Sequence, residues 1–197
     1  MKRQVIMKRR TFIAGMGATV LAARGAVAQT RIEPVPLDEG RLTQAWFLNS
    51  FLGLRDDLAD AASQGKRLAL FWDQRGCPYC QEMHRVNLAD PAVNNYVRER
   101  FNCLQLDLYG AREVTDFDGQ VMTEKELARK YAIAFTPTVQ FLPPTVDAVE
   151  GRSGRALEVA RMPGYFRPGH FEAIFAFVHE RAYERETFQK YLRARAG

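Results

Sequence analysis

The sequence predicts an α/β domain in which a sheet lies between layers of helices. Short continuous apolar runs have the length of buried strands, and helical stretches with apolar residues three or four apart lie between them. Two later strands are separated by Pro- and Gly-rich turns, and an amphipathic helix closes the chain. This order of elements is typical of a three-layer domain of about 150 residues.

The first part of the domain is expected to form a helix, a strand and a second helix. Apolar residues recur between Trp46 and Leu58 at a helical spacing, which predicts an amphipathic helix over 42–62. The run 68–72 is too short for a helix and is expected to be a buried strand. Residues 76–80 (GCPYC) follow at once, and residues 81–88 have helical composition.

The rest of the domain continues the alternation. Asp90 and Pro91 predict the start of a helix, because Asp is a favoured N-cap and Pro is favoured at the first helical position. Thr123 and Glu126 can form a capping box that opens another helix. The further elements are expected at 101–108 (strand), 109–122 (long loop), 123–131 (helix), 138–142 (strand), 156–162 (strand) and 171–178 (helix), followed by a charged helical tail.

Residues 1–28 have the three-part pattern of an export signal. Lys8-Arg9-Arg10 precede an apolar stretch at 11–23, and Ala26-Val27-Ala28 offers small residues to a signal peptidase. The stretch is shorter than the roughly 20 residues that a membrane-spanning helix needs, so we expect cleavage and no lasting membrane anchor. Residues 9–13 (RRTFI) resemble the twin-arginine export motif. We therefore expect a periplasmic protein with a linker at 29–41 and one domain at 42–197 that ends in a helical extension.

The basic charge of the chain belongs to this leader. Of the 28 Lys and Arg residues six precede residue 30, whereas all 23 Asp and Glu residues follow it. After residue 28 the acidic residues outnumber the basic ones by one, so the charge gives no reason to expect nucleic acid as a partner. Three cysteines are too few for a disulfide scaffold, and any cysteine chemistry should be local.

Cys77 and Cys80 form a C-x-x-C motif at the expected start of a helix. Unpaired N–H groups and the positive end of the helix dipole favour a thiolate there, so Cys77, nearer the solvent end, is the expected nucleophile. Cys80, one turn further on, can attack the mixed disulfide that Cys77 forms with a partner, which leaves Cys77 and Cys80 oxidised. Pro78 fixes the turn. The redox-active Cys77–Cys80 disulfide would need no other cofactor.

Other uses of a C-x-x-C motif fit less well, with one exception. Structural zinc usually takes four ligands from two such pairs, and haem attachment requires His where Gln81 stands. The exception is a copper or zinc site, because Cys77, Cys80 and His84 would share one helical face. The competing interpretation is that His84 packs beneath the active-site turn, and under it no metal is expected.

Three features together resemble the thioredoxin family over residues 42–180. They are a strand that ends in Phe71-Trp72, the C-x-x-C motif that opens a helix, and Thr136-Pro137-Thr138 before a strand. The resemblance implies a thioredoxin fold with a central mixed β-sheet flanked by helices, here with an N-terminal helix and a loop insertion. It also implies a thiol–disulfide oxidoreductase in which Pro137 is cis and faces the dithiol and the Thr136 carbonyl is open to a substrate backbone, with Pro78 and Tyr79 as further support.

Within that family, residues 76–84 and 106–119 resemble SoxW-type periplasmic thioredoxins of sulfur oxidation. This closer resemblance implies reduction of disulfides in exported partner proteins, with a membrane thiol transporter as electron donor. A thiol oxidase or disulfide isomerase of the same fold is the alternative, because the direction of electron flow depends on the reduction potential.

Two positions depart from the family pattern. Gly76 stands where the family has Trp, and Phe71 stands where it has a buried Asp that accepts a proton. Asp73 and Asp107 are the candidates for that role. The alternative is that both are solvated or capping groups. Cys103 is expected to be a small buried hydrophobe on its strand.

Overall fold

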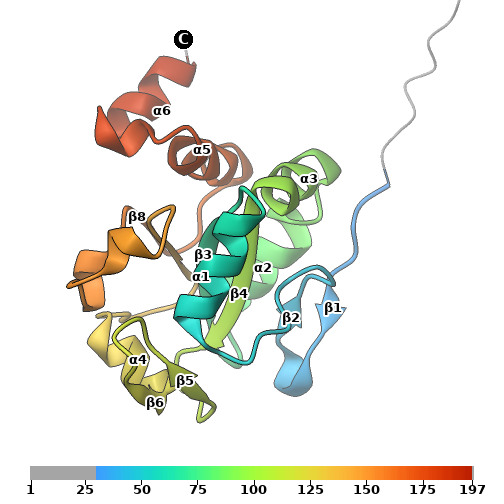
Figure 1. The fold of residues 1–197 in the computed structure, drawn as a ribbon. Helices are drawn as coiled ribbons and strands as arrows, with labels where there is room; N and C mark the ends of the chain where they lie inside the picture. The colour runs from blue at the N-terminus through green and yellow to red at the C-terminus, as the bar shows by residue number, and fades with distance from the viewer. Residues whose placement is uncertain (1–29, 197) are drawn as a thin grey trace, which may run out of the picture.

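The computed structural model describes residues 30–196, which form a sheet between two layers of helices (Figure 1). The central sheet of this part of the chain consists of β3 (Arg67–Asp73), β4 (Phe101–Asp107), β7 (Thr138–Phe141) and β8 (Ala160–Pro163) in the order β4-β3-β7-β8. Strand β3 runs parallel to β4 and antiparallel to β7, and β7 runs antiparallel to β8. The expected mixed sheet flanked by helices is therefore confirmed.

Helices cover both faces of this sheet. They are α1 (Leu54–Ser63), α2 (Pro78–Glu82), which continues as a π-helical turn (Met83–Asn87), α3 (Pro91–Arg100), α4 (Glu124–Lys130), α5 (Pro168–His179) and α6 (Phe188–Ala196). Leu70 and Trp72 of β3 pack in one core with α1 and α4. Phe71, between them in sequence, packs in a second core with the π-helical turn, α3 and α5. Because alternate residues of a strand point to opposite faces, a strand buried on both sides has a continuous apolar sequence.

Aromatic side chains fill the second core. Phe175 of α5 is fully buried, and its ring centroid lies 4.9 Å from those of Phe101 and Phe141 and 4.8 Å from that of Phe171. The rings of Phe101 and Phe141 meet Phe175 edge to face, an arrangement that the charge distribution of aromatic rings favours. These contacts fix α5 on the sheet.

The helix expected over 42–62 is wrong in its first half, since α1 begins only at Leu54. Leu52 adopts a positive φ of 64°, which no right-handed helix allows, and Gly53 is the N-cap. The helical spacing was misleading because its residues serve different cores. Phe47 packs against the second core, whereas Leu54 and Leu58 belong to the first.

Residues 30–48 form what we call the N-terminal strap, which runs beside β4 (Figure 1). It contains a small hairpin of β1 (Val35–Pro36) and β2 (Leu42–Thr43), joined by a 3-10 turn (Asp38–Gly40). The Leu48 N–H donates a hydrogen bond to the Cys103 carbonyl at 2.8 Å. Part of the expected linker at 29–41 is ordered, because the Ile32 N–H donates to the Ala89 carbonyl at 2.9 Å and the Arg41 side chain pairs with Asp73 and Asp107. Further along the strap, the Leu48 hydrogen bond covers part of the edge strand β4.

Three further segments refine the expectation. The loop over 109–122 contains most of a hairpin of β5 (Glu113–Thr115) and β6 (Val121–Thr123). The strand expected at 156–162 begins only at Ala160, because Leu157 turns into the first core from a 3-10 turn (Gly154–Leu157). The charged tail comprises a 3-10 turn (Ala182–Glu184) and α6, and another such turn (Asp147–Val149) follows β7.

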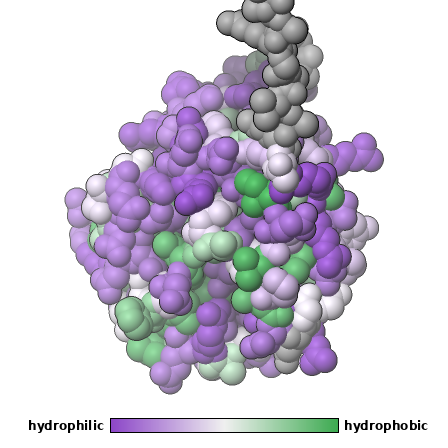
Figure 2. Space-filling view, turned by 90° about the vertical axis from the view of Figure 1, so that its right-hand side faces the viewer, coloured by the Kyte–Doolittle hydropathy of each residue, from purple (hydrophilic) through white to green (hydrophobic). Residues whose placement is uncertain are grey.

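Both predicted helix starts are confirmed. Asp90 Oδ1 accepts hydrogen bonds from the N–H groups of Ala92 and Val93, and Thr123 and Glu126 form the capping box. The expected export signal lies outside the described residues. None of the helices within 30–196 has the length and apolarity to cross a membrane. The face in Figure 2 is mainly hydrophilic with separate hydrophobic areas, and the exposed hydrophobic residues of the strap include Val35 and Leu37.

Candidate active site

Cys77 and Cys80 lie where β3 gives way to α2, and they are joined by a disulfide with Cα atoms 5.3 Å apart. Cys77 is the N-cap of α2, and its Sγ accepts a hydrogen bond from the backbone N–H of Cys80 at 3.1 Å. Pro78 stands in the first turn, where a missing N–H leaves no helix bond unmade. An N–H directed at the Cys77 sulfur favours negative charge on it once the disulfide is reduced.

Exposure does not distinguish the two cysteines, since Cys77 is 5% and Cys80 4% exposed. The expectation that Cys77 lies nearer the solvent thus receives no support from residue burial. Their positions do differ, because Cys77 precedes the helix whereas Cys80 lies inside it and donates its own N–H to Cys77. This difference favours Cys77 as the attacking sulfur.

Gly76, which departs from the family pattern, has a physical explanation in the backbone. Its φ is +70°, in the left-handed region where glycine is favoured. A Trp here would be strained even though no atom lies within 4 Å of a Cβ built on Gly76. The backbone conformation before the cysteine turn therefore disfavours the Trp that the family has at this position.

Exposed aromatic rings lie within the cysteine turn and just before Thr136. Tyr79, between the cysteines, is 61% exposed, and its ring stacks on that of Tyr165 with centroids 6.0 Å apart. The Tyr165 hydroxyl donates to Asn87 Oδ1 at 3.0 Å, which ties this pair to the π-helical turn. Phe135, just before Thr136, is 52% exposed. Such rings offer apolar contact area to an approaching protein.

The Thr136–Pro137 peptide bond is cis, the conformation that the family resemblance implies. Pro137 immediately precedes β7, and Thr138 pairs with Trp72 of β3. Pro137 therefore lies beside the end of β3 from which the cysteine segment continues. Its carbonyl accepts a hydrogen bond from the Gly164 N–H at 2.8 Å, which connects this loop to the end of β8.

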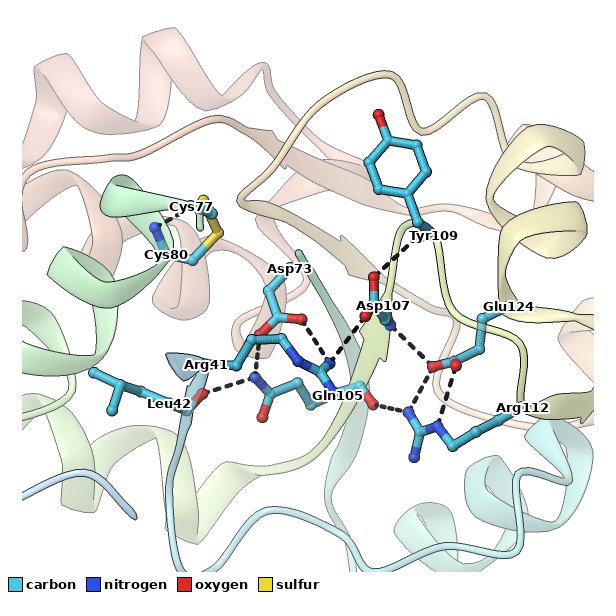
Figure 3. Close-up of polar contacts among 10 residues, drawn as sticks. All are labelled: Arg41, Leu42, Asp73, Cys77, Cys80, Gln105, Asp107, Tyr109, Arg112 and Glu124. Atoms are coloured by element: carbon cyan, nitrogen blue, oxygen red, sulfur yellow. Dashed lines mark hydrogen bonds and ion pairs between the residues drawn. A yellow bond between two sulfur atoms is a disulfide. The ribbon is translucent and has the colours of Figure 1, made fainter. Parts of the chain in front are cut away.

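Asp73, the last residue of β3, is 2% exposed and lies on the same sheet face as Phe71, the face that the π-helical turn after α2 covers. Its carboxylate pairs with Arg41 at 3.3 Å and accepts a hydrogen bond from the Gln105 amide (Figure 3). Burial raises the pKa of Asp73 to about 6, although Arg41 and Gln105 act in the opposite direction. The interpretation of Asp73 as a solvated group is therefore wrong, and a carboxyl of this kind is suited to proton transfer.

Asp107 pairs in register with Asp73 across β3 and β4. Its Oδ1 accepts from the Tyr109 N–H at 2.9 Å, so the capping interpretation is confirmed for Asp107. Its Oδ2 lies 3.4 Å from Nη1 of Arg41, the same nitrogen that pairs with Asp73. The two candidate proton acceptors thus share one guanidinium.

Sequence reasoning missed Arg41, Gln105 and the ion pair behind them. Glu124 is 1% exposed, accepts from the Asp107 N–H at 2.9 Å and pairs with Arg112 (Figure 3). Arg112 also donates to the Gln105 carbonyl at 3.0 Å. Arg41 gave no signal because it lies 32 positions before Asp73 in an apparently unstructured stretch, whereas Gln105 could be suspected as an amide inside an apolar strand.

His84 packs beneath the active-site turn, as one of the two interpretations predicts. It is 1% exposed, its Nδ1 lies 3.4 Å from the Gln44 amide nitrogen, and its ring lies 5.7 Å from that of Phe47. Burial lowers the pKa of His84 to about 4. In the part of the chain that the structure describes, no three His, Cys, Asp or Glu side chains are grouped so that they could hold a metal ion. The alternative site of Cys77, Cys80 and His84 is therefore not assembled.

Cys103 is fully buried, as expected for a core residue, and it carries a free thiol. Burial raises the pKa of this thiol well above its ordinary value. Its place on β4, inside the second core, keeps it from the exchange chemistry of the other two cysteines.

A comparison with models of known protein families assigns the chain to a family. A family model described as a thioredoxin-like domain matches residues 54–179. The chain belongs to the thioredoxin-like family. The thioredoxin-like domain thus begins at α1 and ends with α5, whereas the N-terminal strap and α6 lie outside the matched stretch.

One of the similar solved structures supports a thioredoxin fold. A thioredoxin-fold protein from Helicobacter pylori superposes with a TM-score of 0.52 at 22% identity, over 73% of this chain and 92% of that chain. A thioredoxin from Thermus thermophilus is 28% identical over 64% of this chain and 83% of its own, with a TM-score of 0.47. A protein described as DsbH oxidoreductase is 15% identical over 81% and 94%, with a TM-score of 0.41. No curated protein matches the thioredoxin-like chain significantly.

Proposed function

We propose that this chain is a periplasmic thiol–disulfide oxidoreductase that reduces disulfides of exported partner proteins. The observation that carries the proposal is the Cys77–Cys80 disulfide at the start of α2 in a thioredoxin-like domain. The sulfurs are bonded within one turn of chain, so they can exchange two electrons without a cofactor. Exposed Tyr79 and Phe135 would provide contact area for a partner.

Reduction of a partner would take two steps. The Cys77 thiolate attacks one sulfur of the partner disulfide, which forms a mixed disulfide and releases the other partner sulfur as a thiolate that takes a proton. Cys80 then loses its proton to a base and attacks the Cys77 sulfur, which releases the second partner thiolate and restores the Cys77–Cys80 disulfide. Two electrons pass from the dithiol to the partner, and a dithiol donor must replace them.

Asp73 is the proposed base for the Cys80 proton, with Asp107 as the second candidate. Asp73 is the more suitable of the two because it is buried and its pKa of about 6 allows exchange of a proton near neutral pH. Pro78 would hold the turn, and the Thr136-Pro137 segment beside β3 would receive the partner backbone.

Features of the sequence support the proposed location and electron source. The leader over 1–28 supports export by the twin-arginine route, and the likeness of residues 76–84 and 106–119 to SoxW-type thioredoxins supports a membrane thiol transporter as the electron donor. Partners would be exported proteins with exposed disulfides. Substituting Arg9 and Arg10 together by Lys should leave uncleaved full chain inside the cell, and unchanged export would contradict this route.

The decisive experiment is a trap. Cys80→Ser in the full chain should accumulate mixed disulfides through Cys77 that resolve on addition of a reductant, and mass spectrometry would identify the partners. Cys77→Ser, Cys80→Ser together is the matched control and should trap nothing. The wild-type chain should reduce insulin disulfides with a dithiol donor. Absence of both trapping and turnover would refute the proposed function, and faster oxidation or rearrangement than reduction of substrates would favour the oxidase or isomerase alternative.

A further inference from the structure

The N-terminal strap is not part of the stretch that matches the family, yet its backbone is fixed to the site on both sides of one residue. The Gly40 carbonyl accepts a hydrogen bond from the Gln81 amide of α2 at 3.1 Å. The Leu42 carbonyl accepts one from the Gln105 amide of β4 at 2.8 Å. Arg41 lies between these two residues, so the two hydrogen bonds fix its backbone between the active-site helix and the edge strand.

The Arg41 side chain runs between two carboxylates of neighbouring parallel strands (Figure 3). Its Nη1 lies 3.3 Å from Asp73 Oδ1 and 3.4 Å from Asp107 Oδ2. Arg41 is 19% and Asp73 2% exposed, so solvent screens this contact less than it screens a surface pair. Two carboxylates this close favour protonation of one of them, and a shared guanidinium opposes that tendency.

We propose that Arg41 is a positioning residue of the redox site, which holds the Asp73 carboxylate ionised and oriented so that it can accept the proton of Cys80. The inference rests on the proposed function. It also gives the strap a part in exchange chemistry that the thioredoxin-like domain alone would lack, because residues 54–179 do not include Arg41.

The other groups around Asp73 do not replace Arg41. From β4 come Asp107, which carries negative charge, and Gln105, which is neutral. Arg112, after β4, already pairs with Glu124. From the side of α2, the sulfurs are joined in the disulfide, and burial keeps His84 neutral because its pKa falls to about 4. Arg41 pairs with Asp73 at 3.3 Å and lowers its pKa, against the effect of burial.

A purely structural role for Arg41 makes a different prediction. If Arg41 only fastened the strap, its loss would lower stability and leave the titration of Asp73 where it is. If Arg41 positions an ionised Asp73, its loss must move that titration to higher pH and slow the Cys80 step only where Asp73 has become protonated.

The first test is titration of the oxidised full chain, in which Cys77 and Cys80 cannot titrate. Carbon-13 NMR of labelled Asp carboxyls follows Asp73, whose signal is identified by its loss in Asp73→Asn. Arg41→Gln should raise the Asp73 midpoint by about one pH unit or more, and Arg41→Lys should restore most of it. Arg55→Gln, which breaks an exposed ion pair with Glu150, is the matched control and should change nothing. An unchanged midpoint in Arg41→Gln would overturn the inference.

A second variant keeps the test decisive if Arg41→Gln fails to fold. Asp107→Asn removes the carboxylate that competes for Arg41, so it should lower the Asp73 midpoint. A midpoint that rises or stays in place in this variant would contradict the shared-guanidinium arrangement.

The second test measures the Cys80 step itself. Reduced full chain is mixed with an aromatic disulfide whose released thiolate is coloured, and the second release reports attack of Cys80 on the Cys77 mixed disulfide. Near pH 6, Arg41→Gln should be about fivefold slower than wild type, because a midpoint one unit higher leaves about a fifth as much ionised Asp73, and at high pH the two rates should be equal. An equal loss at every pH, or an unaltered profile in Asp73→Asn, would sink the inference. A wild-type chain that shows no second release would instead refute the proposed function.

Discussion

Replacing Asp73 by Asn should remove a pH-dependent instability from the oxidised protein. Burial raises the pKa of Asp73 from 3.8 to about 6. The folded state therefore holds a proton that the unfolded chain has already released, and the free energy of unfolding falls as the pH rises from about 4 to about 6. A difference of about two pH units at 1.36 kcal/mol each corresponds to about 3 kcal/mol, all of it lost above pH 6.

The assay is urea unfolding of oxidised wild-type and Asp73→Asn protein at several pH values from 4 to 8. The variant loses the ionic contact with Arg41 as well, which adds an offset at neutral pH. The wild-type unfolding free energy relative to that of the variant should fall by up to about 3 kcal/mol between pH 4 and pH 7 and then stay constant. A difference between the two proteins that does not change with pH would refute the reasoning that Asp73 is desolvated in the fold.

Three other predictions concern buried residues. Burial lowers the pKa of His84 from 6.5 to about 4, so the free energy of unfolding should fall by about 3 kcal/mol as the pH drops from 6.5 to about 4. His84→Gln, whose side chain can still accept a hydrogen bond from Gln44, should lack that loss in urea unfolding. Phe175→Ala should cost about 3–5 kcal/mol of unfolding free energy, because it leaves a cavity among packed rings. Phe135→Ala, at an exposed position, should cost far less. Similar urea midpoints for the two variants would contradict the packing described. In reduced protein, iodoacetamide should label Cys77 first and Cys103 only after unfolding. Fast labelling of Cys103 in the folded state would show that β4 opens.

His84 and Asp73 act in opposite directions over almost the same pH range. Below pH 6, His84 takes up a proton more readily in the unfolded chain than in the folded one, which lowers the free energy of unfolding. Asp73 takes up a proton more readily in the folded chain, which raises it. The two effects nearly cancel in the wild type, and the single variants are needed to reveal them.

Much of the fold could be predicted because its signals are local. The run 68–72 had to be buried, Asp90 and Thr123 had to cap helices, and the cysteine pair had to stand at a helix start. The prediction of a helix before α1 was wrong because periodicity reports only the spacing of apolar residues. It does not reveal that Phe47 and Leu54 lie on opposite faces of the sheet.

The candidate site was only half visible for a related reason. Asp73 could be singled out by its distance of four residues from Cys77, but its burial depends on Arg41 and Gln105, which are far from it in sequence. Long-range ion pairs leave no periodic trace in a sequence. A stretch with two prolines and few apolar residues is typical of a linker, although hydrogen bonds at Ile32 and Gly40 hold this one against the domain.

The position of the strap has a practical consequence for anyone who shortens this chain. A chain shortened to begin at residue 54, where the family match starts, would keep both reactive cysteines and look complete by sequence. It would nevertheless bare the outer side of β4, where Leu48 now binds the Cys103 carbonyl. An exposed edge strand can pair with the same strand of another molecule, so precipitation of the trimmed fragment would indicate loss of the segment that covers β4 rather than misfolding of the domain.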